Sequence, residues 1–220
     1  MLDTPMYGLV EAARYLRLPR ATLRSWVIGR RYPKLNGQGH FEPLIQLADE
    51  KSRLLSFGNL IEAYVLRALR QEHGVSIKDV RSALDYAQRK FRISRLLLRS
   101  DLCTGRAGEL FLQRYGELIN LSRSGQLAMH KILKAHLKRV EWDKELASRL
   151  YPYSFGIDDE KLIAIDPTIG FGRPVLIRKG ISTSVIADRV DAGETVESLA
   201  EDYDLETSEV EMAIVYERAA

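Results

Sequence analysis

Residues 11–34, EAARYLRLPRATLRSWVIGRRYPK, constrain the fold of this chain more than any other stretch. Apolar residues recur at helical spacing on both sides of Leu18-Pro19, and a residue that precedes proline is pushed out of the α region. The stretch therefore predicts two short helices joined by a tight turn. Arg17 occupies the turn position where a glycine is usual.

The second predicted helix is basic, because it carries Arg20 and Arg24 and no acidic residue lies between Glu11 and Glu42. A helix-turn-helix places its second helix in the DNA major groove, where side chains distinguish base pairs. We predict that one set of residues faces that groove and that a second set contacts the DNA backbone or forms a wing. The first set is Arg20, Thr22, Arg24 and Ser25, and the second is Arg30, Arg31, Tyr32 and Lys34. The alternative is a helical hairpin whose basic face is only solvated.

Charge is divided unevenly along the 220 residues. Residues 1–100 carry 18 Lys and Arg against 9 Asp and Glu, whereas residues 181–220 carry 2 against 11. A basic segment attracts a polyanion and an acidic segment repels one. We therefore expect the basic end to hold DNA and the acidic end to hold protein.

The remaining pattern predicts an α+β, mainly helical fold in three regions. Residues 1–99 form a DNA-binding domain, with a β-ribbon or wing, a strand at 44–47, and helices at 57–72 and 76–91. Residues 100–160 form a central region of β-hairpin and helix, and residues 161–220 form a C-terminal domain with three helices. The expected central elements are a hairpin around Tyr115-Gly116 and a helix at 125–137, and the expected C-terminal helices span 183–192, 196–203 and 208–218.

Several functional classes lack support in the sequence. No apolar run approaches the roughly 20 residues of a membrane helix, and the single cysteine, Cys103, excludes an internal disulfide, so we expect a cytoplasmic protein. The four histidines are scattered, and Gly170 and Gly172 lack the spacing of a nucleotide-binding loop. No nucleophile, base and orienting group come together. We predict no enzyme activity, no metal and no cofactor.

Two segments resemble known families. EAARYLRLPRATLRSWVIGRRYP, followed by LLSFGNLIEAYVLRALRQEHGVSIKDVRSAL, resembles the DNA-binding region of MerR-type regulators. The motifs FGRPVL, VIADRV, AGETVESLAEDY and EVEMA, in that order, resemble the small winged-helix domain of many bacterial antitoxins. The combination is similar to a VapB-type antitoxin whose partner is a PIN-domain-like ribonuclease toxin.

The resemblance implies the antitoxin of a type II toxin–antitoxin pair, which binds double-stranded operator DNA as a homodimer for autoregulation and neutralises its toxin. An arginine could block the metal-binding carboxylates of such a toxin by bidentate pairing. The candidates are Arg106, Arg114, Arg123 and Arg149, each with surface solubility as the alternative role. The alternatives to an antitoxin are a stand-alone MerR-like transcription regulator without a toxin partner, an enzyme such as a nuclease, against which the missing carboxylate cluster argues, and an adaptor whose acidic end recruits another protein.

Overall fold

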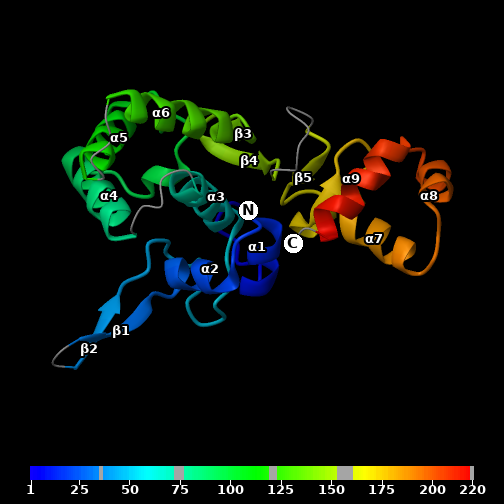
Figure 1. Ribbon diagram of the computed structural model, residues 1–220, viewed down its shortest axis with the longest axis horizontal. Helices are drawn as coiled ribbons and strands as arrows, with labels where there is room; N and C mark the ends of the chain where they lie inside the picture. The colour runs from blue at the N-terminus through cyan, green and yellow to red at the C-terminus, as the bar shows by residue number, and fades with distance from the viewer. Residues whose placement is uncertain (35–36, 72–76, 119–122, 153–160, 219–220) are drawn as a thin grey trace.

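The computed structural model describes residues 1–34, 37–71, 77–118, 123–152 and 161–218. Helices make up most of this part of the chain, and antiparallel strands make up the rest. Figure 1 shows a β-ribbon at the lower left, the N-terminal helices between it and the centre, and the last helices of the chain on the right. The predicted mixed, mainly helical fold is confirmed.

The predicted N-terminal helix pair is present as α1 (Leu9–Tyr15) and α2 (Arg20–Val27). Between them Arg17 has a φ of 49°, a left-handed angle that non-glycine residues adopt only when their surroundings hold them there. Pro19 then stands at the N-cap of α2, where its fixed φ suits a helix start. The turn therefore bends at the residue that the sequence indicated.

A β-ribbon follows, in which β1 (Arg30–Lys34) pairs with β2 (Gly37–Phe41) in antiparallel register. The predicted strand at 44–47 is wrong. The backbone N–H groups of Leu44 and Ile45 both donate to the carbonyl oxygen of Trp26, at 2.7 and 3.0 Å. The segment is thus tied to the end of α2 instead of pairing with a strand.

Four longer helices follow the ribbon and pack on one another: α3 (Phe57–Gln71), α4 (Ile77–Phe91), α5 (Arg106–Leu118) and α6 (Arg123–Leu137). The helices predicted at 57–72, 76–91 and 125–137 are confirmed within the described residues. The predicted hairpin around Tyr115-Gly116 is wrong, because these residues lie within α5.

The packing of α5 explains why the residues around Tyr115-Gly116 form a helix and not a hairpin. Phe111, Leu112 and Tyr115 are all buried, at the spacing of one helical face. A Cβ added at Gly116 would lie 2.7 Å from the side chain of Gln126, so this glycine allows α5 and α6 to approach closely. Gly116 therefore serves helix contact and not a turn.

A five-stranded antiparallel sheet lies between the helical body and the C-terminal helices. Its strands follow one another in space in chain order: β3 (Val140–Asp143), β4 (Leu146–Leu150), β5 (Ile163–Ile165), β6 (Pro174–Leu176) and β7 (Ile181–Ser182). Leu150 and Ile165 belong to a large apolar core that begins at Tyr7. Ile163 and Leu176 belong to a second apolar core, which extends to Tyr216. The sheet therefore contributes to both cores.

The predicted C-terminal helices are confirmed as α7 (Thr183–Asp191), α8 (Val196–Tyr203) and α9 (Thr207–Arg218). Thr195 caps α8, since its side chain accepts a hydrogen bond from the backbone N–H of Ser198. The three helices and the β5–β6–β7 part of the sheet surround the second core.

The last helix also packs against the first. The Tyr216 hydroxyl, buried on α9, donates to the carbonyl oxygen of Tyr15 at 3.0 Å. The Arg17 guanidinium lies 5.2 Å from the centre of the Tyr216 ring, and Arg14 lies 3.7 Å from the carboxylate of Glu217. The C-terminal helices are thereby attached to α1 and to the turn before α2.

Replacing Tyr216 by phenylalanine removes one buried hydrogen bond and keeps the ring. Tyr216→Phe should lower the free energy of unfolding by about 1 kcal/mol, the net contribution typical of such a bond. Urea denaturation followed by circular dichroism measures it. Tyr86→Phe, which removes an exposed hydroxyl from α4, is the control and should change stability by less than about 0.5 kcal/mol. Equal losses in both variants would contradict the assignment.

Candidate nucleic-acid interface

The second helix of the N-terminal pair exposes its basic face. Leu23 and Trp26 are buried at 0% and 1% exposure, so α2 directs its apolar side into the protein. Arg20 and Arg24 are exposed on the other side. Guanidinium groups on an exposed helix can pair bidentately with a phosphate or with the edge of a guanine.

Thr22 and Ser25 are less accessible than the two arginines. Both are half-buried, and the Ser25 hydroxyl donates to the backbone carbonyl of Thr22 at 2.8 Å. In this arrangement the hydroxyl proton of Ser25 is already used within α2. On α2, the two arginines are therefore exposed to solvent, whereas Thr22 and Ser25 are half-buried and reach less far from the helix.

The β-ribbon carries the remaining predicted residues. Arg30 and Arg31 are exposed on β1. Tyr32 stacks on Phe41 of β2, with ring centroids 4.3 Å apart and planes at 27°, so this tyrosine stabilises the ribbon. Lys34 ends β1, and its side chain lies outside the described residues.

The helix and the ribbon meet in one surface hollow of about 600 Å³. Its lining includes Arg24 and Ser25 from α2, Arg30 and Arg31 from β1, and His40 from β2. Sequence reasoning missed His40, which was one of four scattered histidines. The hairpin register brings it opposite Arg31, and that pairing could be found only once both strands were known.

Helix α3 holds the helix pair from behind. The buried guanidinium of Arg67 donates to the carbonyl oxygen of Leu16, at the end of α1, over 2.6 Å. The Arg70 guanidinium lies 5.8 Å from the centre of the Trp26 ring. These contacts fix the orientation of α2 relative to the helical body and thus the direction in which Arg20 and Arg24 point.

The arginines considered for toxin contact have different environments. Arg149 donates to Asp166 at 2.9 and 3.0 Å and to Glu141 at 3.1 Å, so it connects neighbouring strands of the sheet. Burial would raise the pKa of Asp166, but hydrogen bonds from Thr168 and Arg149 outweigh it and lower that pKa. Arg149 therefore has a structural role.

Arg106 is exposed at the start of α5, whereas Arg114, further along the helix, pairs with Glu117 at 3.2 Å. The side chain of Arg123 lies outside the described residues. The structure thus leaves Arg106 and Arg114 as the described candidates on the surface.

The acidic end of the chain is partly neutralised by its own cations. Arg189 pairs with Glu194 and Asp202, and Arg178 pairs with Glu209 at 2.6 Å. The pKa of Glu209 is lowered, chiefly by the hydrogen bond from Arg178. Other carboxylates remain exposed: Asp188, Glu197, Glu201 and Glu211 on the three helices, and Glu206 in the connection between α8 and α9. The surface formed by these exposed carboxylates is called the acidic face of the C-terminal helices.

Other chemistry has little support among the described residues. No group of three or more His, Cys, Asp and Glu side chains in that part of the chain could hold a metal ion. Cys103 is buried, and burial raises the pKa of its thiol to about 11, which keeps the thiol protonated near neutral pH. Of the helices whose residues are described, none has the length and apolar character needed to cross a membrane.

Comparisons with known proteins agree with this arrangement. Residues 5–84 match the family described as "Putative DNA-binding HTH domain", and residues 163–216 match "Protein of unknown function (DUF433)". The chain is 34% identical to "Putative antitoxin VapB45" of Mycobacterium tuberculosis, over 91% of this chain and 89% of that protein. It belongs to the family of this antitoxin.

Two further matches extend the comparison. An uncharacterised protein of the same bacterium, Rv2308, is 28% identical over 98% of this chain and 91% of its own length. The crystal structure of Rv2018 from Mycobacterium tuberculosis matches with a TM-score of 0.68 and 26% identity, covering 97% of this chain and 99% of that one. The similarity to VapB45 covers 91% of the chain, and the match to the structure of Rv2018 covers 97% of it. The chain is an antitoxin-like protein with a helix-turn-helix domain.

The joint between α2 and the ribbon depends on Gly29. Its φ is +84°, and an added Cβ would lie 2.3 Å from the carbonyl oxygen of Phe41. Gly29→Ala should therefore lower the free energy of unfolding by roughly 2 kcal/mol or more, from backbone strain plus the forced shift of the ribbon. Thermal and urea unfolding measure the loss.

Gly193→Ala is the matched control, because Gly193 also has a positive φ (+100°) but no atom within 4 Å of an added Cβ. It should lose only the conformational part, about 1 kcal/mol. A Gly29→Ala variant no less stable than Gly193→Ala would show that the ribbon does not rest against α2 as described.

Proposed function

We propose that this chain is the antitoxin of a type II toxin–antitoxin pair, which represses its own operator and neutralises a PIN-domain-like ribonuclease. The observation that carries the proposal is the 34% identity to an antitoxin over nine-tenths of the chain, combined with an exposed basic helix in a helix-turn-helix domain. The protein would act by binding, without catalysis.

For DNA, we propose a MerR-like winged helix-turn-helix in which α2 enters the major groove. Arg20, Thr22, Arg24 and Ser25 would face the bases, and Arg30, Arg31, Tyr32 and Lys34 would contact the backbone. The hollow shared by α2 and β1 supports this arrangement, because its arginines come from both elements. Of the seven residues whose side chains the structure describes, Arg20, Arg24, Arg30 and Arg31 have the exposure that phosphate or base contact requires.

A base-reading residue and a backbone-contacting residue should behave differently when each is replaced by alanine. Arg24→Ala should weaken binding to the DNA upstream of the protein's own reading frame by roughly 1–3 kcal/mol if Arg24 bonds to a guanine. Lys34→Ala should weaken binding about equally on all sequences and reduce the slope of log K against log salt by about one. Fluorescence anisotropy on that DNA and on an unrelated duplex separates the two effects.

The control for these variants is Arg106→Ala, which removes an exposed arginine from α5 and should leave both affinities unchanged. Operator binding equal to that of the unaltered protein in both the Arg24 and Lys34 variants would exclude the proposed interface.

For protein partners, we propose a homodimer whose acidic end holds the toxin. One helix-turn-helix reads a short site, so two-fold proteins commonly match two-fold operators. The acidic face lies on α7, α8 and α9, which Figure 1 shows on the side of the molecule away from the ribbon. A toxin held there would leave α2 and the ribbon accessible to DNA.

Co-expression with the protein encoded by the neighbouring reading frame tests this part of the proposal. A PIN-like neighbour should form a stable complex with this chain, and its growth inhibition should be relieved. Light scattering should give the mass of two copies for the chain alone. Operator binding without a complex or a PIN-like neighbour would favour the stand-alone regulator, and the mass of one copy would exclude the homodimer.

A further inference from the structure

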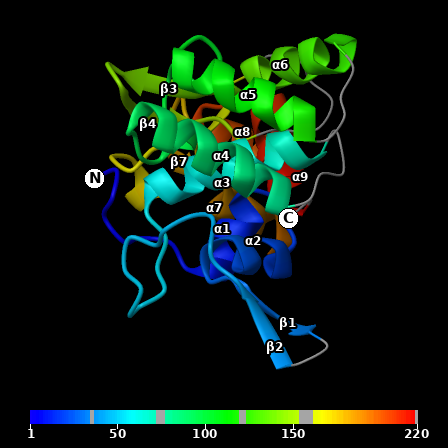
Figure 2. The same cartoon turned by 90° about the vertical axis from the view of Figure 1, so that its left-hand side faces the viewer.

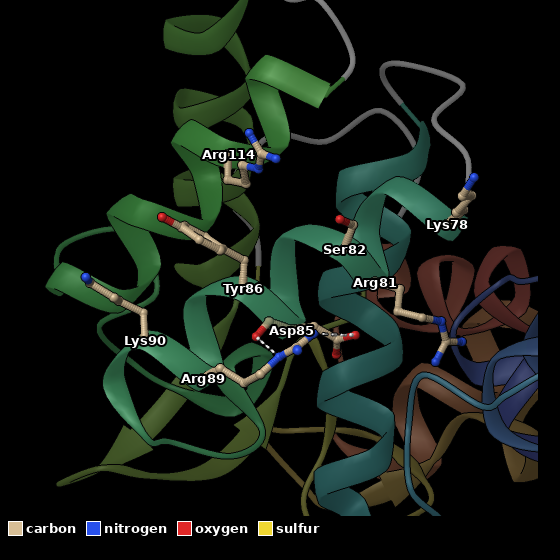
Figure 3. A pocket seen from close by; sticks show the side chains of 8 residues that line it. All are labelled: Lys78, Arg81, Ser82, Asp85, Tyr86, Arg89, Lys90 and Arg114. Atoms are coloured by element: carbon tan, nitrogen blue, oxygen red, sulfur yellow. Dashed lines mark hydrogen bonds and ion pairs between the residues drawn. The ribbon is translucent and has the colours of Figure 1, made fainter.

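A second basic surface lies outside the helix-turn-helix. It is a groove between α4 and α5, with a volume of about 620 Å³, lined by Lys78, Arg81, Ser82, Asp85, Tyr86, Arg89, Lys90 and Arg114 (Figure 3). Among these lining residues, five are cationic and Asp85 is the single carboxylate. The surface therefore has a strong excess of positive charge.

Most of that charge is not cancelled by the contacts of the groove. Arg81 donates to the backbone carbonyl oxygens of Glu42 and Pro43, which are neutral groups. Arg89 lies 3.7 Å from Asp85 and Arg114 lies 3.2 Å from Glu117, and both are surface ion pairs of the kind that contributes little. For Lys78 and Lys90, no carboxylate of the described residues lies within ion-pair distance. Both lysines can therefore pair with an external anion.

The shape of the groove suits an extended anion. Lys78 and Lys90 stand about 18 Å apart along the axis of α4, a length over which duplex DNA carries about ten phosphate charges. The Arg114 guanidinium lies 5.7 Å from the centre of the Tyr86 ring, so the aromatic side chain holds this cation at the groove. Figure 3 shows Lys78 and Arg81 toward one end of the groove and Lys90 toward the other.

The groove adjoins the proposed DNA-binding elements. Arg81 bonds to the residues that directly follow β2, so the groove begins where the ribbon ends. Figure 1 places α4 and the ribbon on the left of the molecule and the C-terminal helices on the right, and Figure 2, which looks at that left-hand side, shows α4 toward the viewer with the ribbon projecting below it. The matched DNA-binding family ends at residue 84, whereas Arg89, Lys90 and Arg114 lie beyond it.

We propose that the α4–α5 groove is a second phosphate-binding surface, which contacts the backbone of the same DNA that α2 reads. This inference rests on the proposed DNA binding and extends its footprint. An acidic protein segment is the competing occupant. The groove favours nucleic acid because its cations are many and Tyr86 is its only aromatic lining residue, whereas protein-binding surfaces centre on clusters of large apolar side chains.

The test compares two doubly substituted proteins of equal charge. Lys78→Ala/Lys90→Ala removes the two lysines of the groove, and Lys131→Ala/Lys134→Ala removes two exposed lysines from α6. Binding to a mixed-sequence duplex of about 40 base pairs is measured between about 50 and 200 mM salt. Circular dichroism establishes that each variant is folded, and Lys78→Gln/Lys90→Gln replaces the alanine pair if that variant does not fold.

The groove variant should bind roughly tenfold more weakly at about 100 mM salt, and its salt slope should fall by about two, since each phosphate contact contributes about 0.9. The α6 variant should bind as the unaltered protein does, and Lys78→Arg/Lys90→Arg should retain most of the affinity. Equal losses in the groove and α6 variants, or no loss in either, would overturn the inference.

The failure of the inference is distinguishable from that of the proposed function. If the unaltered protein does not bind the duplex or its own upstream DNA, the proposed DNA binding itself is wrong. If the groove variant keeps full DNA affinity but loses its complex with the neighbouring protein, the groove is a protein-binding surface and the phosphate assignment is overturned.

Discussion

The turn between α1 and α2 is the constraint on which the proposed interface depends, and it is held from two sides. On one side, Arg67 of α3 donates to the carbonyl oxygen of Leu16, a group that the end of a helix leaves without an intrahelical partner. On the other side, Arg17 keeps a left-handed backbone against the ring of Tyr216. Because both contacts are long-range, the direction of α2 is fixed by the folded protein and not by the turn alone.

This arrangement links the two ends of the chain physically. Helix α9 contributes Tyr216 to the turn, and its neighbour Glu217 faces Arg14 of α1. The C-terminal helices therefore contact the same short segment that sets the orientation of α2, while their acidic face points elsewhere. A protein bound to the acidic face and a DNA duplex bound to α2 would occupy different surfaces of one connected body.

The charge pattern along the chain describes each end incompletely, because the folded protein pairs many of the charges internally. The −9 charge of residues 181–220 is reduced in the folded protein, because Arg178 and Lys179, which precede that segment, pair with Glu209 and Asp204. Likewise, the sequence offers Arg149 as one of four candidates for toxin contact, whereas its bonds to Asp166 and Glu141 assign it to the sheet. Ion pairs between residues distant in sequence cannot be read from composition.

Local pattern predicts α1, α2, α3, α4, α6 and the three C-terminal helices, since helical periodicity and capping residues act over a few positions. It failed at α5, where the short apolar runs around Tyr115 fitted a strand as well as a helix. Packing of Phe111 and Tyr115 into the core decided for the helix. The basic groove was missed for the same reason, because its cations come from two helices whose pairing was unknown.

The sequence by itself determined that this chain has a basic helix pair at one end and an acidic helical unit at the other, because charge and periodicity are properties of neighbouring residues. The tertiary structure alone decided which arginines are exposed and which are bonded internally, how the ribbon meets α2, and that α9 supports the turn. Those features depend on contacts between segments up to 201 residues apart, which exist only once the chain has folded.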